Sequence, residues 1–161
     1  MTGHHLNLIL KLSSILLIAL ALKYHYSTAS VNELRWVLAP TSALVELITG
    51  AGFTFEHHAG YMSADNTFLI AASCAGVNFL IIAFLLLTLG SVWGEETLKW
   101  RSIPFALCAS YLVALVANTT RIIVAMLLQR SGFGGEGLHR IEGIVVYFIF
   151  LILLFVLNER R

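Results

Sequence analysis

Three residues in separate apolar stretches carry side chains that could together perform nucleophilic chemistry. Cys74 lies in the stretch AASCAGVNF, Arg121 ends the stretch NTTR, and His139 stands just before the last apolar run. An ionised cysteine is a strong nucleophile, an arginine stabilises negative charge, and a histidine exchanges protons near neutral pH. These residue types could together support nucleophilic catalysis by a cysteine, provided that the fold brings them together.

The composition places these residues in a membrane protein. Of the 161 residues, 58% are hydrophobic and only 12% are charged, and the mean hydropathy is +0.85. This apolar share is far above that of an ordinary soluble domain. The formal net charge is +1 and there is no long basic block, which argues against nucleic acid as a partner. With no internal repeat and no flexible linker, residues 1–161 are predicted to form a single transmembrane domain.

Four apolar runs are candidates for membrane spans, since a bilayer core requires about 20 helical residues. They are residues 6–24, 68–89, 103–128 and 141–157. The first run could instead be a signal peptide that ends near STASV. No lysine or arginine precedes it, which favours an uncleaved span.

The residues after the first span predict a short helix that does not cross the bilayer. Pro40 suits the first turn of a helix and Gly50 suits its end. A helix between them is about 15 Å long, too short to span, so it is expected to be interfacial or re-entrant. One side of this helix would be formed by Leu44, Val45, Leu47 and Ile48.

A small polar segment separates this helix from the second span. Phe53 and Phe55 alternate with polar residues, which predicts a hairpin that turns near Ala59-Gly60. Asp65 and Asn66 are expected to cap the second span. The predicted fold is thus an all-α integral membrane protein of about four transmembrane helices, with a short interfacial or re-entrant helix and a small extramembrane hairpin.

The order of the spans brings the three reactive residues to one side of the membrane. If the second span begins at Phe68, Cys74 lies about 9 Å below the surface at which that span starts. The third span returns to the same surface, and Arg121, seven residues before Leu128, lies about 10 Å below it. His139 would follow in the loop on that side. Three separate elements therefore deliver reactive side chains to nearly one depth.

Small residues on the spans predict close helix packing near these groups. On the third span they share one face and are spaced by four, at Ala106, Ser110, Ala114 and Asn118. On the second span Ala72 and Gly76 have the same spacing, while Cys74 and Asn78 share a neighbouring face. Asn118 or Asn78 could orient the reactive groups by hydrogen bonding. Cys108 lies near the opposite surface, out of disulfide reach of Cys74, and is assigned to packing.

Simpler interpretations remain for each of these residues. Cys74 could be a packing residue, and Arg121 could bind an anion in a non-enzymatic membrane subunit or a small transporter. His57, His58 and His139 could form a metal site, although adjacent histidines in an extended segment point in opposite directions and no zinc-helix spacing is present. No metal or other cofactor is therefore expected. The glycine-rich segment Ser131–Arg140 is either a flexible connection or a mobile lid beside His139.

Three blocks of the sequence resemble the signature blocks of the exosortase and archaeosortase family. They are SCAGVNF around Cys74, NTTRI with Arg121, and HRIEGIVVYF beginning with His139. Their order on successive spans is similar as well, and the resemblance extends from about residue 40 to residue 147. The short chain is most similar to the compact exosortase K branch. The family often has serine after the cysteine, where this chain has Ala75.

The resemblance implies a membrane cysteine transpeptidase and assigns roles to the three residues. Cys74 would be the nucleophile that forms a thioester, Arg121 would stabilise the thiolate or the oxyanion, and His139 would be the general acid and base. Asn118, Asn78 and Gly76 would support them.

The resemblance also implies partners and a location. The substrates would be exported proteins with a PEP-CTERM-like signal, which consists of a short motif, a transmembrane segment and a basic tail. The acceptor would be a lipid or an amine. The protein would lie in the lipid bilayer of a prokaryotic cytoplasmic (inner) membrane, with its active site on the extracytoplasmic side. Lysine and arginine divide four against four between the two sides, so charge does not decide the orientation.

Overall fold

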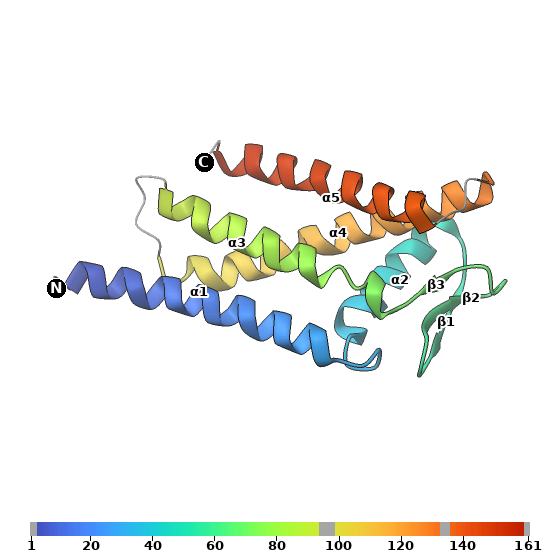
Figure 1. Ribbon diagram of the computed structural model, residues 1–161, viewed down its shortest axis with the longest axis horizontal. Helices are drawn as coiled ribbons and strands as arrows, with labels where there is room; N and C mark the ends of the chain where they lie inside the picture. Colours follow the sequence, from blue (N-terminus) through green and yellow to red (C-terminus); the bar gives the residue numbers. More distant parts are fainter. Residues whose placement is uncertain (1–2, 94–98, 133–135, 160–161) are drawn as a thin grey trace.

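Four long helices form the body of the molecule in the computed structural model, which describes residues 3–93, 99–132 and 136–159. They are α1 (Gly3–Thr28), α3 (Val77–Trp93), α4 (Ser102–Arg130) and α5 (Glu136–Glu159). Successive members of this set run in opposite directions (Figure 1). Within the described ranges, all four are long and apolar enough to cross a membrane. The predicted multi-pass, all-α membrane architecture is confirmed.

Helix α3 is the central helix of the bundle, in contact with α1, α4 and α5. Its interface with α4 is lined by small buried side chains, among them Ala83, Ala114 and Ala117. Small residues allow two helix backbones to approach closely in lipid. The predicted small face of α4 is confirmed, because all four of its members are buried: Ala106, Ser110, Ala114 and Asn118.

Helix α2 (Arg35–Thr49) is the short helix, and it begins five residues before the predicted start. Pro40 therefore lies inside the helix rather than in its first turn. Proline has no N–H, so the carbonyl of Trp36 loses the donor that residue 40 would supply. The hydroxyl of Tyr111 on α4 donates a hydrogen bond of 2.7 Å to that carbonyl, and the two aromatic rings stack with centroids 5.7 Å apart. This contact anchors α2 on α4.

The buried side of α2 differs from the predicted apolar side. Val37, Leu38 and Val45 are buried, whereas Leu47 and Ile48 are exposed. Of the four residues predicted to form one side, Val45 is buried and Leu44 is partly buried, because the buried side of α2 is the one that packs on α4 and the sheet. With 15 residues, α2 is about 22 Å long, which is still too short to cross a bilayer core.

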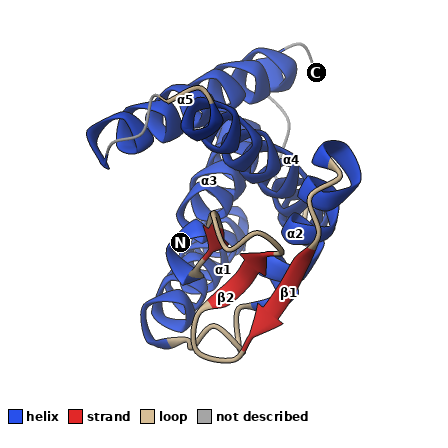
Figure 2. Cartoon of the chain, turned by 90° about the vertical axis from the view of Figure 1, so that its right-hand side faces the viewer, coloured by secondary structure: helices blue, strands red, loops and turns tan. Residues whose placement is uncertain are grey.

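A three-stranded antiparallel sheet follows α2 and contains the predicted hairpin. Strand β1 (Phe53–Glu56) pairs with β2 (Gly60–Ser63), and β2 pairs with β3 (Leu69–Ile70). The turn requires Gly60, whose φ is 130°, since a Cβ there would collide with the carbonyl oxygen of Ile70. Figure 2 looks at the molecule from the end that carries this sheet and α2.

The prediction that Asp65 and Asn66 cap the second span is wrong. Both residues lie in the turn between β2 and β3. One carboxylate oxygen of Asp65 accepts hydrogen bonds from the Ser63 hydroxyl and from the N–H and hydroxyl of Thr67. These bonds stabilise the ionised carboxylate and lower the pKa of Asp65 to about 2. Asn66 has a φ of 56°, which belongs to a turn and not to a helix start.

The prediction of a helix that begins at Phe68 is also wrong. Residues 69–70 form β3, residues Ala72–Cys74 form a single 3₁₀ turn, and α3 begins only at Val77. Gly76 has a φ of 68°, which redirects the chain into α3. Cys74 therefore stands three residues before the helix and not within it.

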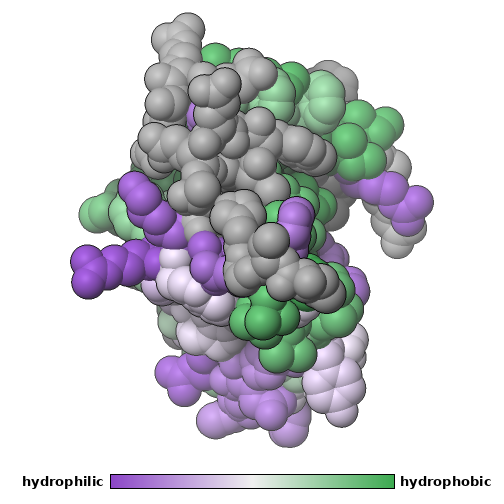
Figure 3. Space-filling view, turned by 90° about the vertical axis from the view of Figure 1, so that its left-hand side faces the viewer, coloured by the Kyte–Doolittle hydropathy of each residue, from purple (hydrophilic) through white to green (hydrophobic). Residues whose placement is uncertain are grey.

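The two ends of the bundle differ. The sheet and α2 cover the end at which α3 begins (Figure 1). Figure 3 shows the opposite end, where hydrophilic and hydrophobic residues lie beside one another around the grey atoms. The long helices expose many large apolar side chains, among them Leu17, Leu112 and Phe148, which suits a bundle whose sides face lipid.

Candidate functional site

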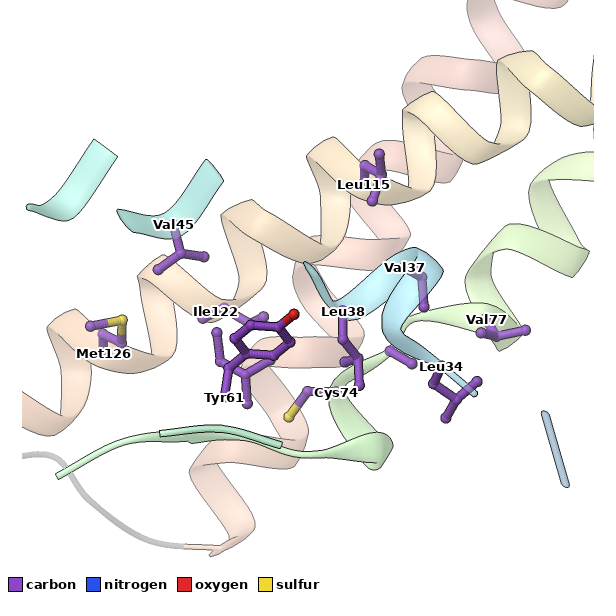
Figure 4. Close-up of a cluster of buried hydrophobic side chains, with 12 residues drawn as sticks. Leu34, Val37, Leu38, Val45, Tyr61, Cys74, Val77, Leu115, Ile122 and Met126 are labelled. Atoms are coloured by element: carbon purple, nitrogen blue, oxygen red, sulfur yellow. The ribbon is translucent and has the colours of Figure 1, made fainter. Parts of the chain in front are cut away.

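Cys74 lies under the cover that α2 and the sheet form over the start of α3. Its side chain is buried and belongs to an apolar cluster with Leu38 of α2 and Tyr61 of β2 (Figure 4). The backbone N–H of Cys74 donates to the carbonyl of Ala71 at 2.8 Å, which closes the 3₁₀ turn. Cys74 thus ends the turn that stands three residues before the first residue of α3.

Asn118 of α4 holds the backbone of this turn. Its side-chain N–H donates to the carbonyl oxygen of Cys74 at 2.6 Å, and the Asn118 side chain is completely buried. Gly76 makes this approach feasible, since a Cβ at position 76 would lie 3.0 Å from Asn118 Cγ. The predicted close packing of Ala72 and Gly76 along one helix face is wrong because neither residue lies in α3. Gly76 does approach α4 closely, at the side chain of Asn118.

Arg121 reaches Cys74 from one turn further along α4. Its Nη2 donates to the Cys74 sulfur at 3.7 Å, and its Nη1 donates to the hydroxyl of Tyr147 on α5 at 3.2 Å. These partners are a thiol and a phenol, not carboxylates. The Nε of Arg121 is buried and has no hydrogen-bond partner among the residues that the structure describes. The side chain passes along α5 at Gly143, where a Cβ would lie 3.4 Å from Arg121 Cδ.

Tyr147 completes the group and was not predicted as a site residue. Its hydroxyl donates to Asn118 Oδ1 at 2.8 Å while it accepts from Arg121. Its ring stacks on Phe79 of α3, with centroids 4.8 Å apart and an interplanar angle of 20°. The sequence contained one signal for it, since a phenol hydroxyl within an apolar span requires a hydrogen-bond partner.

These contacts form a closed circuit of four side chains from three elements. Arg121 connects to the sulfur of Cys74 and to Tyr147, Tyr147 connects to Asn118, and Asn118 returns to the backbone of Cys74. A sulfur in this position faces the positive charge of the Arg121 guanidinium. Such an arrangement favours negative charge on the sulfur and on an oxygen beside it.

The other predicted site residues lie apart from this circuit or outside the described side chains. Asn78 is exposed, and its amide oxygen accepts a 2.8 Å hydrogen bond from Lys23 of α1. The backbone of His139 lies in the first turns of α5, and its side chain is outside the described part of the structure. Cys108 is a free, exposed cysteine on α4, so its predicted packing role does not fit its surroundings.

One histidine of the hairpin turn, His57, contacts the segment before α2. The ring Nδ1 of His57 lies 3.3 Å from the Asn32 side-chain oxygen, which ties the turn to the segment before α2. Across the residues that the structure describes, no group of three His, Cys, Asp or Glu side chains could hold a metal ion.

Comparison with known proteins found one family whose model covers most of the chain. A family model of transmembrane exosortases (Exosortase_EpsH) matches residues 6–156, a range that contains every residue of the circuit. Searches of curated proteins and of solved structures found no match.

Proposed function

The chain belongs to the transmembrane exosortase family, and from this premise we propose that it is a cysteine peptidase and transpeptidase. It would cleave the C-terminal sorting signal of exported proteins and pass them to an acceptor. The observation that carries the proposal is the 3.7 Å contact between Arg121 Nη2 and the Cys74 sulfur, two residues that the span order predicts on one side of the membrane.

In the first step the Cys74 thiolate attacks the carbonyl carbon of the scissile peptide bond. The carbonyl oxygen takes the electron pair and becomes an oxyanion. The C–N bond then breaks, the carbonyl re-forms as a thioester on Cys74, and the leaving nitrogen takes up a proton. The C-terminal fragment departs with its new amino group. Formation of a covalent intermediate divides one difficult step into two easier ones.

Arg121 has two tasks in this step, and its geometry supports both. Before attack its guanidinium lies beside the sulfur and favours the charged nucleophile. After attack the negative charge moves to the former carbonyl oxygen, which is bonded to the carbon that the sulfur now holds. A donor already within 4 Å of the sulfur is close to that oxygen. The buried Nε, which has no partner within the described part of the chain, is a further donor on the same group.

His139 is the proposed general acid and base, as the resemblance implies. Position 139 precedes Gly143 by one helical turn on α5, and Gly143 is the residue that the Arg121 side chain passes. His139 would accept the thiol proton and return it to the leaving nitrogen. Water, an amine or a lipid acceptor would then attack the thioester and free Cys74.

A location in the membrane suits such a substrate. Its transmembrane segment would dock from the bilayer against the bundle, with the motif at the end that carries α2 and the sheet. Confinement to one bilayer raises the effective concentration of the scissile bond at the nucleophile. We further propose that this end faces the extracytoplasmic side of a prokaryotic cytoplasmic membrane, since the substrates are exported proteins.

The decisive experiment compares the two free cysteines of the chain. An exported protein with a tripartite C-terminal signal from the same genome is co-expressed, and its processing is followed by gel mobility and mass spectrometry. Processing is expected to be lost in Cys74→Ala and Cys74→Ser and retained in the matched control Cys108→Ala. Arg121→Gln and His139→Ala should reduce it at least a hundredfold, which corresponds to about 2.7 kcal/mol of lost transition-state stabilisation. Processing that survives Cys74→Ala overturns the proposal.

A second candidate function follows from the two partners that the structure describes for the Arg121 guanidinium, a thiol and a phenol. In a non-enzymatic subunit or a small transporter, the guanidinium would bind an anion and Cys74 would pack. This function predicts that chloride or phosphate raises the thermal stability of wild-type protein and of Cys74→Ala equally, and that Arg121→Gln abolishes the effect. The peptidase proposal predicts no such anion dependence in Cys74→Ala.

A further inference from the structure

Tyr147 is the member of the circuit to which the resemblance assigns no role, although it lies in the third signature block, HRIEGIVVYF. We propose that it is a positioning residue, whose hydroxyl fixes the directions in which Arg121 and Asn118 meet Cys74. This inference rests on the proposed function, because it concerns the reactivity of the proposed nucleophile.

The hydroxyl of Tyr147 determines which way the Asn118 amide faces. Asn118 donates its N–H to the carbonyl of Cys74, so its oxygen must face the opposite way, toward Tyr147. The phenol proton meets that oxygen at 2.8 Å. A flipped amide would place its oxygen against the Cys74 carbonyl oxygen, and two acceptors repel each other. Loss of the hydroxyl removes the partner that makes the present orientation of the amide favourable.

The same oxygen determines where Arg121 points. Since the phenol proton is used on Asn118, the phenol oxygen has lone pairs free for Arg121 Nη1. The guanidinium is planar, so a bond at Nη1 restricts the position of Nη2, the atom that reaches the Cys74 sulfur. An arginine side chain without this restraint has several rotamers, and only some of them bring it to the sulfur. Gly143 leaves space along α5 for such movement.

The phenol ring is itself fixed relative to the nucleophile. It stacks on Phe79, which lies in the first turn of α3, five residues after Cys74. The hydroxyl is therefore held relative to α3 by the ring and relative to α4 by its two hydrogen bonds. Helix α5 thus acts on Cys74 through the hydroxyl oxygen of Tyr147, which contacts Arg121 and Asn118.

The experiment measures the positive potential at the Cys74 sulfur with two small alkylating reagents. Iodoacetate and iodoacetamide are nearly equal in size but differ by one negative charge, and both react with the same thiolate. The ratio of their rates therefore reports the charge beside the sulfur and is insensitive to the fraction of thiolate. The measurement is made on purified full-length protein in detergent, in a Cys108→Ala background, with modification of Cys74 followed by mass spectrometry.

Arg121→Gln is expected to lower the ratio of the iodoacetate rate to the iodoacetamide rate about fourfold, the effect of a unit charge roughly 5 Å away in water. Tyr147→Phe, which keeps the ring on Phe79, is expected to lower it at least about twofold because Arg121 spends less time at the sulfur. Added to Arg121→Gln, Tyr147→Phe should change the ratio no further. The matched control is Tyr111→Phe, which also removes a hydroxyl bonded between two elements but leaves the circuit intact.

Two outcomes overturn the proposal. One is an unchanged ratio in Tyr147→Phe, and the other is an equal fall in Tyr111→Phe, which would indicate general loosening of the bundle. Neither outcome affects the proposed peptidase function, which fails only if processing of the co-expressed substrate survives Cys74→Ala. The two proposals are therefore tested separately.

Discussion

The side-chain amide of Asn118 donates a 2.6 Å hydrogen bond to the backbone carbonyl of Cys74, 44 residues earlier in the chain. The bond joins the middle of α4 to the turn before α3, in a completely buried position. It makes the conformation of the nucleophile's backbone dependent on a residue of the next helix. Several measurable consequences depend on this bond and on its neighbours.

The first prediction concerns Asn118 itself. Asn118→Ala leaves the Cys74 carbonyl and the Tyr147 hydroxyl without their partner, and buried polar groups without partners are costly. The free energy of unfolding should fall by about 1 to 3 kcal/mol, measured by SDS titration of the protein in detergent micelles. The matched control is Asn78→Ala, since Asn78 is exposed and bonded to Lys23. If Asn78→Ala lowers the free energy of unfolding as much as Asn118→Ala does, the buried hydrogen bonds of Asn118 are not the cause of the loss.

The second prediction isolates the contact between Gly76 and Asn118. Gly76 and Gly50 have nearly the same φ, 68° and 70°, but only a Cβ at Gly76 would meet another residue within 4 Å. Gly50→Ala should therefore cost about 1 to 2 kcal/mol, from backbone strain alone. Gly76→Ala should cost more and should also slow alkylation of Cys74 by iodoacetamide, because Asn118 is displaced. Equal stability losses in the two variants would show that the contact contributes nothing.

The third prediction concerns the anchor of α2. Tyr111→Phe leaves the Trp36 carbonyl, already deprived of a helical donor by Pro40, without a partner, so stability should fall by about 1 to 3 kcal/mol. In a Pro40→Ala background residue 40 regains an N–H that can bond this carbonyl. Tyr111→Phe should then cost clearly less, and a double-mutant cycle of unfolding free energies measures the difference. A coupling energy near zero would exclude this explanation of the contact.

The fourth prediction concerns acid. The pKa of Asp65 is lowered from its ordinary value of 3.8 to about 2, so the ionised group stabilises the turn between β2 and β3. This contribution is complete above pH 3.8 and disappears as the pH falls toward 2, where the folded carboxylate takes up its proton. Pepsin, which is active in this range, should cut residues 63–68 increasingly fast between pH 4 and pH 2. Asp65→Asn, whose side chain does not titrate, should show no such increase beyond the change in pepsin activity itself.

The sequence allowed the spans to be predicted because hydropathy is a local property. Runs of about 20 apolar residues require helices in a bilayer, and α1, α3, α4 and α5 lie where those runs are. Their alternating direction then brought Cys74 and Arg121 to one end of the bundle. The hairpin was predicted for a similar reason, since alternation around Phe53 and Phe55 is a local signal.

The start of α3 was misjudged because an apolar run does not reveal its own secondary structure. Residues 68–89 contain no charge, and periodicity alone does not distinguish a buried strand from a buried helix. Leu69 and Ile70 form a strand because β2 lies beside them, and β2 is brought there by the hairpin. A pairing partner supplied by the tertiary fold thus decided the local conformation.

The sequence by itself determined a multi-pass membrane bundle and the placement of Cys74 and Arg121 at one end of it, because apolar length and span order are enough for both. Only the tertiary structure decided that Cys74 stands at the entrance to α3 and that Tyr147 links Asn118 to Arg121. Hydrogen bonds require donor and acceptor within about 3 Å of each other. Such distances depend on how α3, α4 and α5 cross, and a linear pattern of residues does not contain that information.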